Sequence, residues 1–168
     1  MINPIISLLG NPAPFLDKIF AYLAQKGINT DAYFLDHICY RVETTERYNT
    51  LKINLSNKGE LLTESQIGGR TIASFKLNEP YIYKDRKIEV VELPAPKEGS
   101  FYKEGFEHVE FVIAMPFVDF MNQYPQLTFI TKDLKKKVNK GITLKEKDFS
   151  IKFHHHSLEY VIRYLDRL

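Results

Sequence analysis

The chain has 168 residues, of which 44% are hydrophobic and 26% charged, and its formal net charge is +2. This length suits one domain with a substantial core, and the composition argues against disorder. The charge of the chain is only mildly basic and lacks the concentrated positive field of a nucleic-acid-binding protein. No apolar run is long enough to span a bilayer, and residues 1–10 lack a signal-peptide pattern. A cytoplasmic protein with no membrane role and no nucleic-acid partner is therefore predicted.

Helical spacing of apolar residues predicts an opening helix that begins after Asn11 and ends at Gly27. Thr44 is of a residue type that caps helices, and it follows a predicted strand. The pair Gly68 and Gly69 supplies the positive φ angles that a tight hairpin turn needs. The first half is predicted to form helix, strand, helix and three strands at residues 12–27, 35–42, 44–59, 60–67, 70–77 and 87–93.

After Pro94 and Pro96 the order of elements begins again. Each half is interpreted as one strand, one helix and three strands, although residues 133–145 are too polar to assign. The second half is predicted to form strand, helix, strand, strand and terminal helix at residues 107–114, 116–124, 127–132, 149–154 and from 157 onward. This order predicts an α+β class with a mixed, mainly antiparallel sheet. The domain is predicted to span residues 1–168, with a helical extension at 1–34 and modules at 35–96 and 97–168.

One face of the predicted strands is unusually polar. Side chains two residues apart along a strand point to the same face, so strand parity indicates which of them can converge. An interior seldom tolerates so many charged groups unless they are paired or hold a ligand. The face carries His37, Arg41, Arg70, Ser74, Lys76, Glu92, His108, Glu110, Lys152 and His154.

Three further features each have two interpretations. Cys39 is the only cysteine, so it cannot form an intramolecular disulfide. It is interpreted either as a reactive thiol or as a residue that simply packs in the interior. The lysine-rich segment 132–140 is a solvated loop or a phosphate-binding patch, and the lack of interleaved aromatic residues favours the loop. The segment 94–105 is a lid over a site or a linker between the modules.

Four separated segments resemble the YecM family: LDHICYR (35–41), GELLTESQIGGRTIASFKLNEP (59–80), VELPAPKEGSFYKEGFEHVEFVI (91–113) and SIKFHHHSLEYVI (150–162). They agree in order and cover most of the chain. That family looks like a branch of the vicinal oxygen chelate superfamily, which includes glyoxalase I, methylmalonyl-CoA epimerase, extradiol dioxygenases and bleomycin-resistance proteins. Because this fold hosts unrelated chemistries, the resemblance does not specify a reaction.

The resemblance implies two βαβββ modules that form a cupped sheet around one divalent metal ion, with extra helices at both ends of the chain. It implies one ligand on the first and last strand of each module, which are His37, Glu92, His108 and His154. Two histidines and a carboxylate suit Fe(II), while an added histidine also suits Zn, Ni or Mn. The histidine at position 154 departs from the glutamate that is commoner in the superfamily, which puts a proton-shuttling carboxylate there in doubt.

Other residues of the polar face are candidates for roles beside the implied metal ion. Glu110 is a candidate base, an alternative ligand, or a partner of Arg41 or Arg70. A small anionic substrate would be held by basic side chains, for which surface charge or pairing with Glu92 and Glu110 is the alternative interpretation. These basic candidates are Arg41, Arg70, Lys76 and Lys152.

The leading functional prediction is a divalent-metal-dependent isomerase, epimerase or lyase, in which the ion acts as a Lewis acid on a small anionic molecule. An Fe(II) oxygenase is a second enzymatic alternative. A non-catalytic module that sequesters a small ligand, as bleomycin-resistance proteins do, is an alternative of a different class. The oligomeric state is left open between monomer and homodimer.

Overall fold

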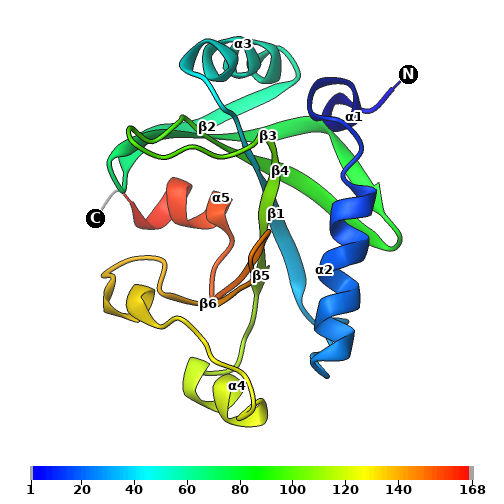
Figure 1. Ribbon diagram of the computed structural model, residues 1–168, viewed down its shortest axis with the longest axis vertical. Helices are drawn as coiled ribbons and strands as arrows, with labels where there is room; N and C mark the ends of the chain where they lie inside the picture. The colour runs from blue at the N-terminus through cyan, green and yellow to red at the C-terminus, as the bar shows by residue number, and fades with distance from the viewer. Residues whose placement is uncertain (1, 167–168) are drawn as a thin grey trace. The chain divides into compact units, whose positions relative to one another are not determined.

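The computed structural model describes residues 2–166, which form seven strands together with short and long helices (Figure 1). These residues divide into two compact units. Unit 1 contains residues 2–12 and 37–107, and unit 2 contains residues 13–36 and 108–166. The predicted α+β class, with a mixed sheet and helices near both ends of the chain, is confirmed.

Unit 1 contains the complete strand–helix–three-strand order that the sequence predicts. After α1 (Pro4–Leu9), its elements are β1 (Phe34–Arg41), α3 (Thr45–Ser56), β2 (Gly59–Ile67), β3 (Arg70–Tyr83) and β4 (Arg86–Pro94). The strands lie in the order β2-β3-β4-β1. Strands β2, β3 and β4 are antiparallel neighbours, whereas β1 is parallel to β4, so the pairing is mixed and mainly antiparallel.

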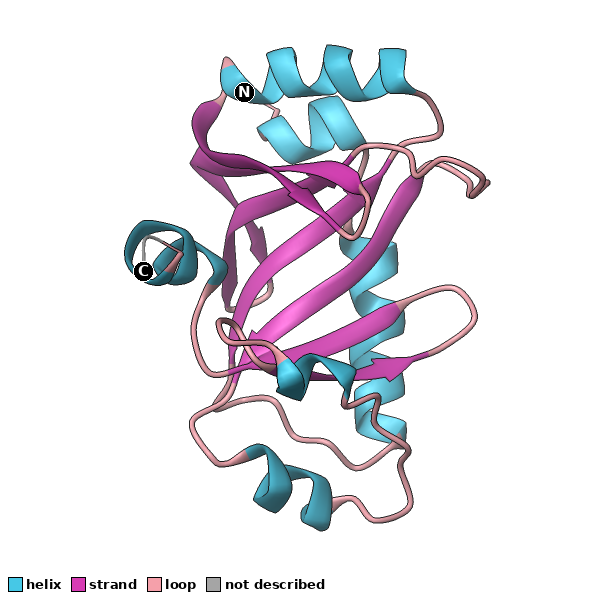
Figure 2. Ribbon diagram, turned by 90° about the vertical axis from the view of Figure 1, so that its left-hand side faces the viewer, coloured by secondary structure: helices cyan, strands magenta, loops and turns pink. Residues whose placement is uncertain are grey.

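Helix α3 begins where the sequence predicts, because the Thr44 hydroxyl accepts a hydrogen bond from the backbone N–H of Arg47 at 3.1 Å. Tyr48, Leu51 and Leu55 recur at helical spacing and form its buried face. Figures 1 and 2 show α1 and α3 side by side, and α3 packs on strands of unit 1.

The hairpin between β2 and β3 is confirmed, and both turn glycines have positive φ, 59° at Gly68 and 83° at Gly69. Strand β3 continues well beyond the predicted residue 77 to Tyr83. Its pairing with β4 is interrupted between Lys76 and Tyr81, where the register shifts. This interruption contains Pro80, which has no N–H to donate to a neighbouring strand.

Unit 2 combines an early helix with the second half of the chain. Its elements are α2 (Ala13–Gln25), β5 (Gly105–Val112), α4 (Phe117–Gln123), the 3₁₀ helix η1 (Lys132–Lys135), β6 (Gly141–Lys145), β7 (Ser150–His154), α5 (Leu158–Tyr160) and the π-helix η2 (Val161–Leu165). The strands lie in the order β5-β7-β6. Strand β7 is parallel to β5 and antiparallel to β6.

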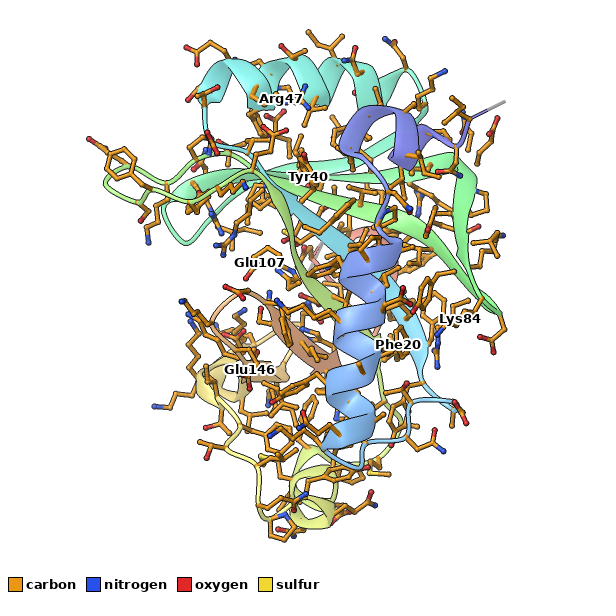
Figure 3. The ribbon with its side chains drawn as sticks, turned by 45° about the vertical axis from the view of Figure 1, so that its right-hand side comes forward. Phe20, Tyr40, Arg47, Lys84, Glu107 and Glu146 are labelled. Carbon is orange, nitrogen blue, oxygen red and sulfur yellow. The ribbon has the colours of Figure 1, made fainter. Side chains whose placement is uncertain are left out.

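Aromatic side chains build the core of unit 2. The ring of Phe20, which Figure 3 labels on α2, meets Phe111 edge-on with centroids 6.0 Å apart. Phe153 contacts Phe111 at 5.9 Å and Phe120 at 4.7 Å. Phe111 and Phe153 lie on β5 and β7, so the apolar faces of these two strands are directed into this core and their other faces are left for polar groups. Among residues 2–166, no helix has both the length and the hydropathy of a membrane span.

The predicted strand at 127–132 is wrong. Only Ile130 pairs with a strand, through two backbone hydrogen bonds to Thr143 of 2.8 and 3.0 Å, and η1 begins at Lys132. The neighbouring Phe129 packs edge-on against Phe120 of α4 at 5.9 Å. The apolar side chain of Phe129 thus packs on a helix and does not mark a strand. The second half of the chain therefore has one strand fewer than predicted.

Candidate functional site

Strands β5 and β7 bring together four of the predicted site residues within unit 2. In their parallel register Glu110 pairs with Lys152 and Val112 pairs with His154, so these side chains share a face with His108. His108, Glu110 and His154 are only 4%, 5% and 4% exposed. The convergence of these residues, predicted from strand parity, is thus present; we call His108, Glu110, Lys152 and His154 the β5–β7 cluster.

Glu110 is the centre of the β5–β7 cluster. Its Oε2 lies 2.9 Å from His154 Nε2, and its Oε1 lies 3.1 Å from Lys152 Nζ and 3.5 Å from His108 Nε2. Lys152 Nζ is also 3.4 Å from His108 Nε2. A buried carboxylate requires such neighbours, because removing its charge from water without compensation costs several kcal/mol.

The ring of His154 is oriented by a backbone carbonyl. Its Nδ1 lies 2.9 Å from the carbonyl oxygen of Lys140, and since a carbonyl only accepts, Nδ1 carries the proton. In a neutral imidazole the lone pair is then on Nε2. Although Nε2 is 2.9 Å from Glu110 Oε2, this buried nitrogen makes no hydrogen bond with the described residues.

The spacing of each histidine from the carboxylate can be compared with that of two ligands on one metal ion. Two ligand atoms that each lie about 2.0–2.2 Å from one ion are separated by about 3.0–3.5 Å, depending on the coordination geometry. The separations of 2.9 Å from Glu110 Oε2 to His154 and of 3.5 Å from Glu110 Oε1 to His108 are each close to this range. The Lys140 carbonyl holds the far side of the His154 ring, as outer partners of metal-binding histidines commonly do.

Unit 1 holds the other two predicted metal ligands as a pair. His37 on β1 is fully buried, and its Nε2 lies 3.9 Å from Oε2 of Glu92 on β4. In the parallel register of these strands Cys39 is paired with Glu92. On the other side of β4, Ser74 of the antiparallel strand β3 is also paired with Glu92. Cys39 is also fully buried, which agrees with a packed thiol.

The predicted anion-binding arginines meet at an aromatic ring within unit 1. The guanidinium carbon of Arg41 lies 4.8 Å from the ring centroid of Tyr102, and Arg70 Nη1 donates a hydrogen bond to the Tyr102 hydroxyl at 2.9 Å. Arg41 also forms an ion pair of 3.3 Å with Glu107. The backbone N–H of Lys97 donates to the same hydroxyl at 3.0 Å, so Tyr102 fastens the segment 95–104 to β1 and β3.

Glu104 fastens the far end of that segment. It accepts hydrogen bonds from the Tyr40 hydroxyl at 2.8 Å and from Arg47 Nε at 2.9 Å, and Figure 3 labels both donors. The backbone N–H of Glu104 donates to Glu43 at 3.0 Å. Burial, followed by the hydrogen bond to Glu104, raises the pKa of Tyr40 to about 12.

The remaining candidates are Lys76 and the lysine-rich segment. Lys76 is half-buried on β3, opposite Glu60 of β2 and Val90 of β4. In the lysine-rich segment, Lys136 forms an ion pair with Asp133 at 3.1 Å.

Sequence reasoning missed several residues that arrange the site. Tyr102, Glu104 and Glu107 orient the arginines and the segment 95–104, and Lys140 contributes only a backbone oxygen. Gly141 was also missed, although it gives the ring of His154 its space: a Cβ there would lie 2.5 Å from His154 Cε1. A glycine that opens a strand is a signal of such a close approach.

These observations define the class of protein: an α+β protein with a mixed sheet, in which buried histidine and glutamate side chains form groups that can bind a metal ion. The chain belongs to the YecM family, because the family model described as YecM protein matches residues 6–164.

Two curated relatives and a solved structure agree with this assignment. The chain is 39% identical over 102 residues to Protein YecM of Escherichia coli (strain K12), covering 59% of this chain and 53% of the relative. It is 30% identical over 114 residues to an uncharacterised protein of Haemophilus influenzae (strain Rd), covering 68% and 59%. The chain thus matches between half and three-fifths of the length of these relatives. A solved structure described as Structural Genomics, Protein EC4020 is 26% identical, covers 96% of both chains and has a TM-score of 0.79.

A more distant likeness is to the fosfomycin resistance protein FosX of Listeria monocytogenes, solved as a mutant with Mn(II) and dihydroxypropylphosphonic acid. It is 15% identical, covers 77% of this chain and 97% of that one, and has a TM-score of 0.28. A TM-score this low does not establish a shared fold.

Proposed function

We propose that this YecM-family chain is a divalent-metal-dependent enzyme, with His108, Glu110 and His154 among the metal ligands. The observation that carries the proposal is the His154 ring, whose Nδ1 is engaged by a backbone carbonyl while its buried Nε2 faces a carboxylate without a hydrogen bond. A neutral imidazole lone pair beside a carboxylate is unfavourable unless a proton or a cation lies with them. Two histidines and one carboxylate suit Fe(II), and also Zn, Ni or Mn.

We further propose that His37 and Glu92 bind metal, as the family resemblance implies. They form a pair in unit 1 in which His37 is fully buried and Glu92 is partly exposed, and neither belongs to the β5–β7 cluster. The amount of metal bound per chain distinguishes two arrangements. In the first, the chain binds one equivalent of metal, and His37→Ala and His154→Ala each abolish its binding. In the second, the chain binds two equivalents, and each of these variants loses one of them. Both arrangements agree with metal binding by these residues.

When bound, a divalent ion supplies Lewis-acid stabilisation of negative charge on a substrate oxygen. The chain's own basic groups would hold an anionic substrate: Lys152 beside Glu110, and in unit 1 Arg41, Arg70 and Lys76. Such an arrangement serves isomerase, epimerase or lyase chemistry, in which a proton moves next to a stabilised oxyanion. An Fe(II) oxygenase uses the same ligand set with open positions on the ion.

The first experiment measures the metal content of protein purified without chelators, by mass spectrometry, for the parent and for His108→Ala, His154→Ala and His156→Ala. We expect near-stoichiometric transition metal in the parent and in the His156 variant, because His156 lies outside the cluster and stacks on Tyr160. We expect loss of metal in the two cluster variants. A parent that neither contains metal nor takes up added Fe(II), Zn, Ni or Mn would falsify the proposal.

Glu110→Gln separates two roles of this carboxylate. As a ligand, Glu110 contributes a negative oxygen that glutamine lacks, so the variant should bind metal weakly. If the variant instead keeps its metal and loses only catalysed proton exchange on small 2-oxo or 2-hydroxy acids, followed by NMR in deuterated water, then Glu110 is the base and its ligand assignment is wrong.

A second candidate function, a metal-free ligand-binding module, is favoured by one observation. Lys152 already places a positive charge 3.1 Å from Glu110 and thereby compensates this carboxylate without an ion. Such a module should bind a small anion with the same affinity in EDTA and after His108→Ala or His154→Ala substitution. An enzyme with metal ligands at these positions should lose affinity for the anion under both conditions.

A further inference from the structure

A pocket of about 300 Å³ in unit 2 belongs to neither the β5–β7 cluster nor the His37–Glu92 pair. It is lined by residues 137–140, His155, His156 and Leu165. Its volume is at the lower end of the range of small-molecule sites. The pocket includes the end of the lysine-rich segment, whose side chains have no role in the metal-site proposal.

One wall of the pocket is a fixed imidazole ring. His155 Nδ1 donates a hydrogen bond to the carbonyl of Ile113 at 2.9 Å, and its ring stacks on Phe117 with centroids 3.9 Å apart. Val138 and Leu165 add aliphatic surface. A flat ring held from two sides beside aliphatic groups is a surface on which an apolar, planar body packs well.

The pocket carries positive charge that this chain does not neutralise. Lys137 and Lys140 are both exposed, and no ion pair joins either of them to a carboxylate within residues 2–166. The neighbouring Lys136, in contrast, is paired with Asp133 at 3.1 Å. Two unpaired cations beside an apolar pocket attract an anionic group.

Asn139 adds an unused polar group between these two lysines. Its backbone has a φ of 52°, a left-handed conformation that asparagine tolerates better than most residues. Its Oδ1 is buried and makes no hydrogen bond with the described residues. An unpaired buried acceptor is unfavourable, and a molecule bound beside it would supply the missing donor.

We propose that this pocket binds a small organic anion with a planar apolar body and one hydrogen-bond donor. Lys137 and Lys140 bind the anionic group, His155, Val138 and Leu165 pack against the body, and Asn139 accepts from the donor. Carboxylates and phosphate esters share this chemistry. None of the lining side chains is a proposed metal ligand, and the pocket meets the proposed metal site only through the backbone carbonyl of Lys140, which orients His154.

The test uses metal-free protein in EDTA and the fluorescent probe 1-anilinonaphthalene-8-sulfonate, which has an aromatic body, an anionic group and an N–H donor. We expect saturable binding that weakens at least about tenfold in Lys137→Ala/Lys140→Ala and in Asn139→Asp, which adds a negative charge at nearly constant shape. The matched control is Lys132→Ala/Lys135→Ala, in which two lysines of η1 outside the pocket are removed and the affinity is unchanged. Circular dichroism checks that each variant is folded.

Displacement of the probe identifies the anion. Salicylate offers a carboxylate and a hydroxyl donor, and phenyl phosphate offers a phosphate ester; displacement by either one supports the pocket and shows which group it prefers. The proposal is overturned if the parent does not bind the probe. It is also overturned if neither compound displaces the probe, or if both pocket variants bind it as tightly as the parent.

Discussion

His154 donates its Nδ1 proton to the carbonyl oxygen of Lys140 at 2.9 Å, and this one bond determines which nitrogen faces Glu110. Lys140 immediately precedes β6, and β6 and β7 are antiparallel with Gly141 paired to His154. The ring therefore lies directly over Gly141, where any larger residue would collide with it. The orientation of a proposed metal ligand thus depends on the backbone of a neighbouring strand.

Gly141→Ala should weaken metal binding without removing any ligand. The new Cβ would lie 2.5 Å from His154 Cε1 and 2.9 Å from the carbonyl oxygen of Phe153, so the ring has to shift from the position that places its Nε2 beside Glu110. Overpacking of this kind costs about 1–3 kcal/mol of folding free energy. The metal affinity, measured by competition with a chromophoric chelator, should fall at least about tenfold.

Lys145→Ala is the matched control for this substitution, because Lys145 lies at the exposed end of the same strand. Its metal affinity should equal that of the parent. If Gly141→Ala also binds metal as the parent does, then the orientation of the His154 ring does not govern the site.

Lys152→Met should raise metal affinity. The ammonium group lies 3.1 Å from Glu110 and 3.4 Å from His108 Nε2, where its charge repels a divalent ion and competes with it for the carboxylate. In EDTA the variant leaves Glu110 without its nearest cation, so the free energy of unfolding should drop by about 3 kcal/mol and recover when metal is added. Lys145→Met serves as the control, and a variant that binds metal no more tightly than the parent contradicts this role of Lys152.

Local signals predicted most of the fold. Thr44 caps α3 as predicted, the terminal helical segment follows Ser157 as predicted, and the glycine pair 68–69 marks the hairpin turn. These signals depend only on neighbours in the chain. The predicted strand at 127–132 was wrong because Phe129 packs on α4, and a short apolar run has the same composition whether it forms a strand or covers a helix.

The β5–β7 cluster was predictable for a related reason. Strand parity places Glu110 with His108 and Lys152 with His154, and the parallel register brings these pairs together. Tyr102 and Glu104 were not predictable, since they lie in an irregular segment whose position is decided by side chains far away in the sequence. The Lys140 carbonyl has no side-chain signature at all.

Tyr40→Phe should remove a pH-dependent part of the stability. Its hydroxyl is protonated in the fold, and burial together with Glu104 raises its pKa from 10.0 to about 12. A group whose pKa is raised on folding contributes stability that is present below pH 10 and is lost as the pH rises through 12. Urea unfolding should show Tyr40→Phe about 1 kcal/mol less stable than the parent at pH 8, with the difference shrinking toward pH 12.

The comparison for this titration is Tyr164→Phe, because Tyr164 is exposed and lies outside unit 1. That variant should stay within about 0.5 kcal/mol of the parent at every pH. If the loss of unfolding free energy in Tyr40→Phe is the same at pH 8 and pH 12, then Tyr40 stabilises the fold through packing and not through the proton on its hydroxyl.

Tyr102→Ala should release the segment 95–104. The hydroxyl of Tyr102 receives hydrogen bonds from Arg70 and from the Lys97 backbone, and its ring lies under Arg41, so the substitution removes three contacts at once. Trypsin should then cleave faster after Lys97 or Lys103, while the free energy of global unfolding changes little, because local opening is decoupled from the core. Phe101→Ala is the matched control: its side chain is fully exposed, and cleavage should proceed at the parent rate. Equal cleavage of the two variants would show that the contacts of Tyr102 do not hold the segment in place.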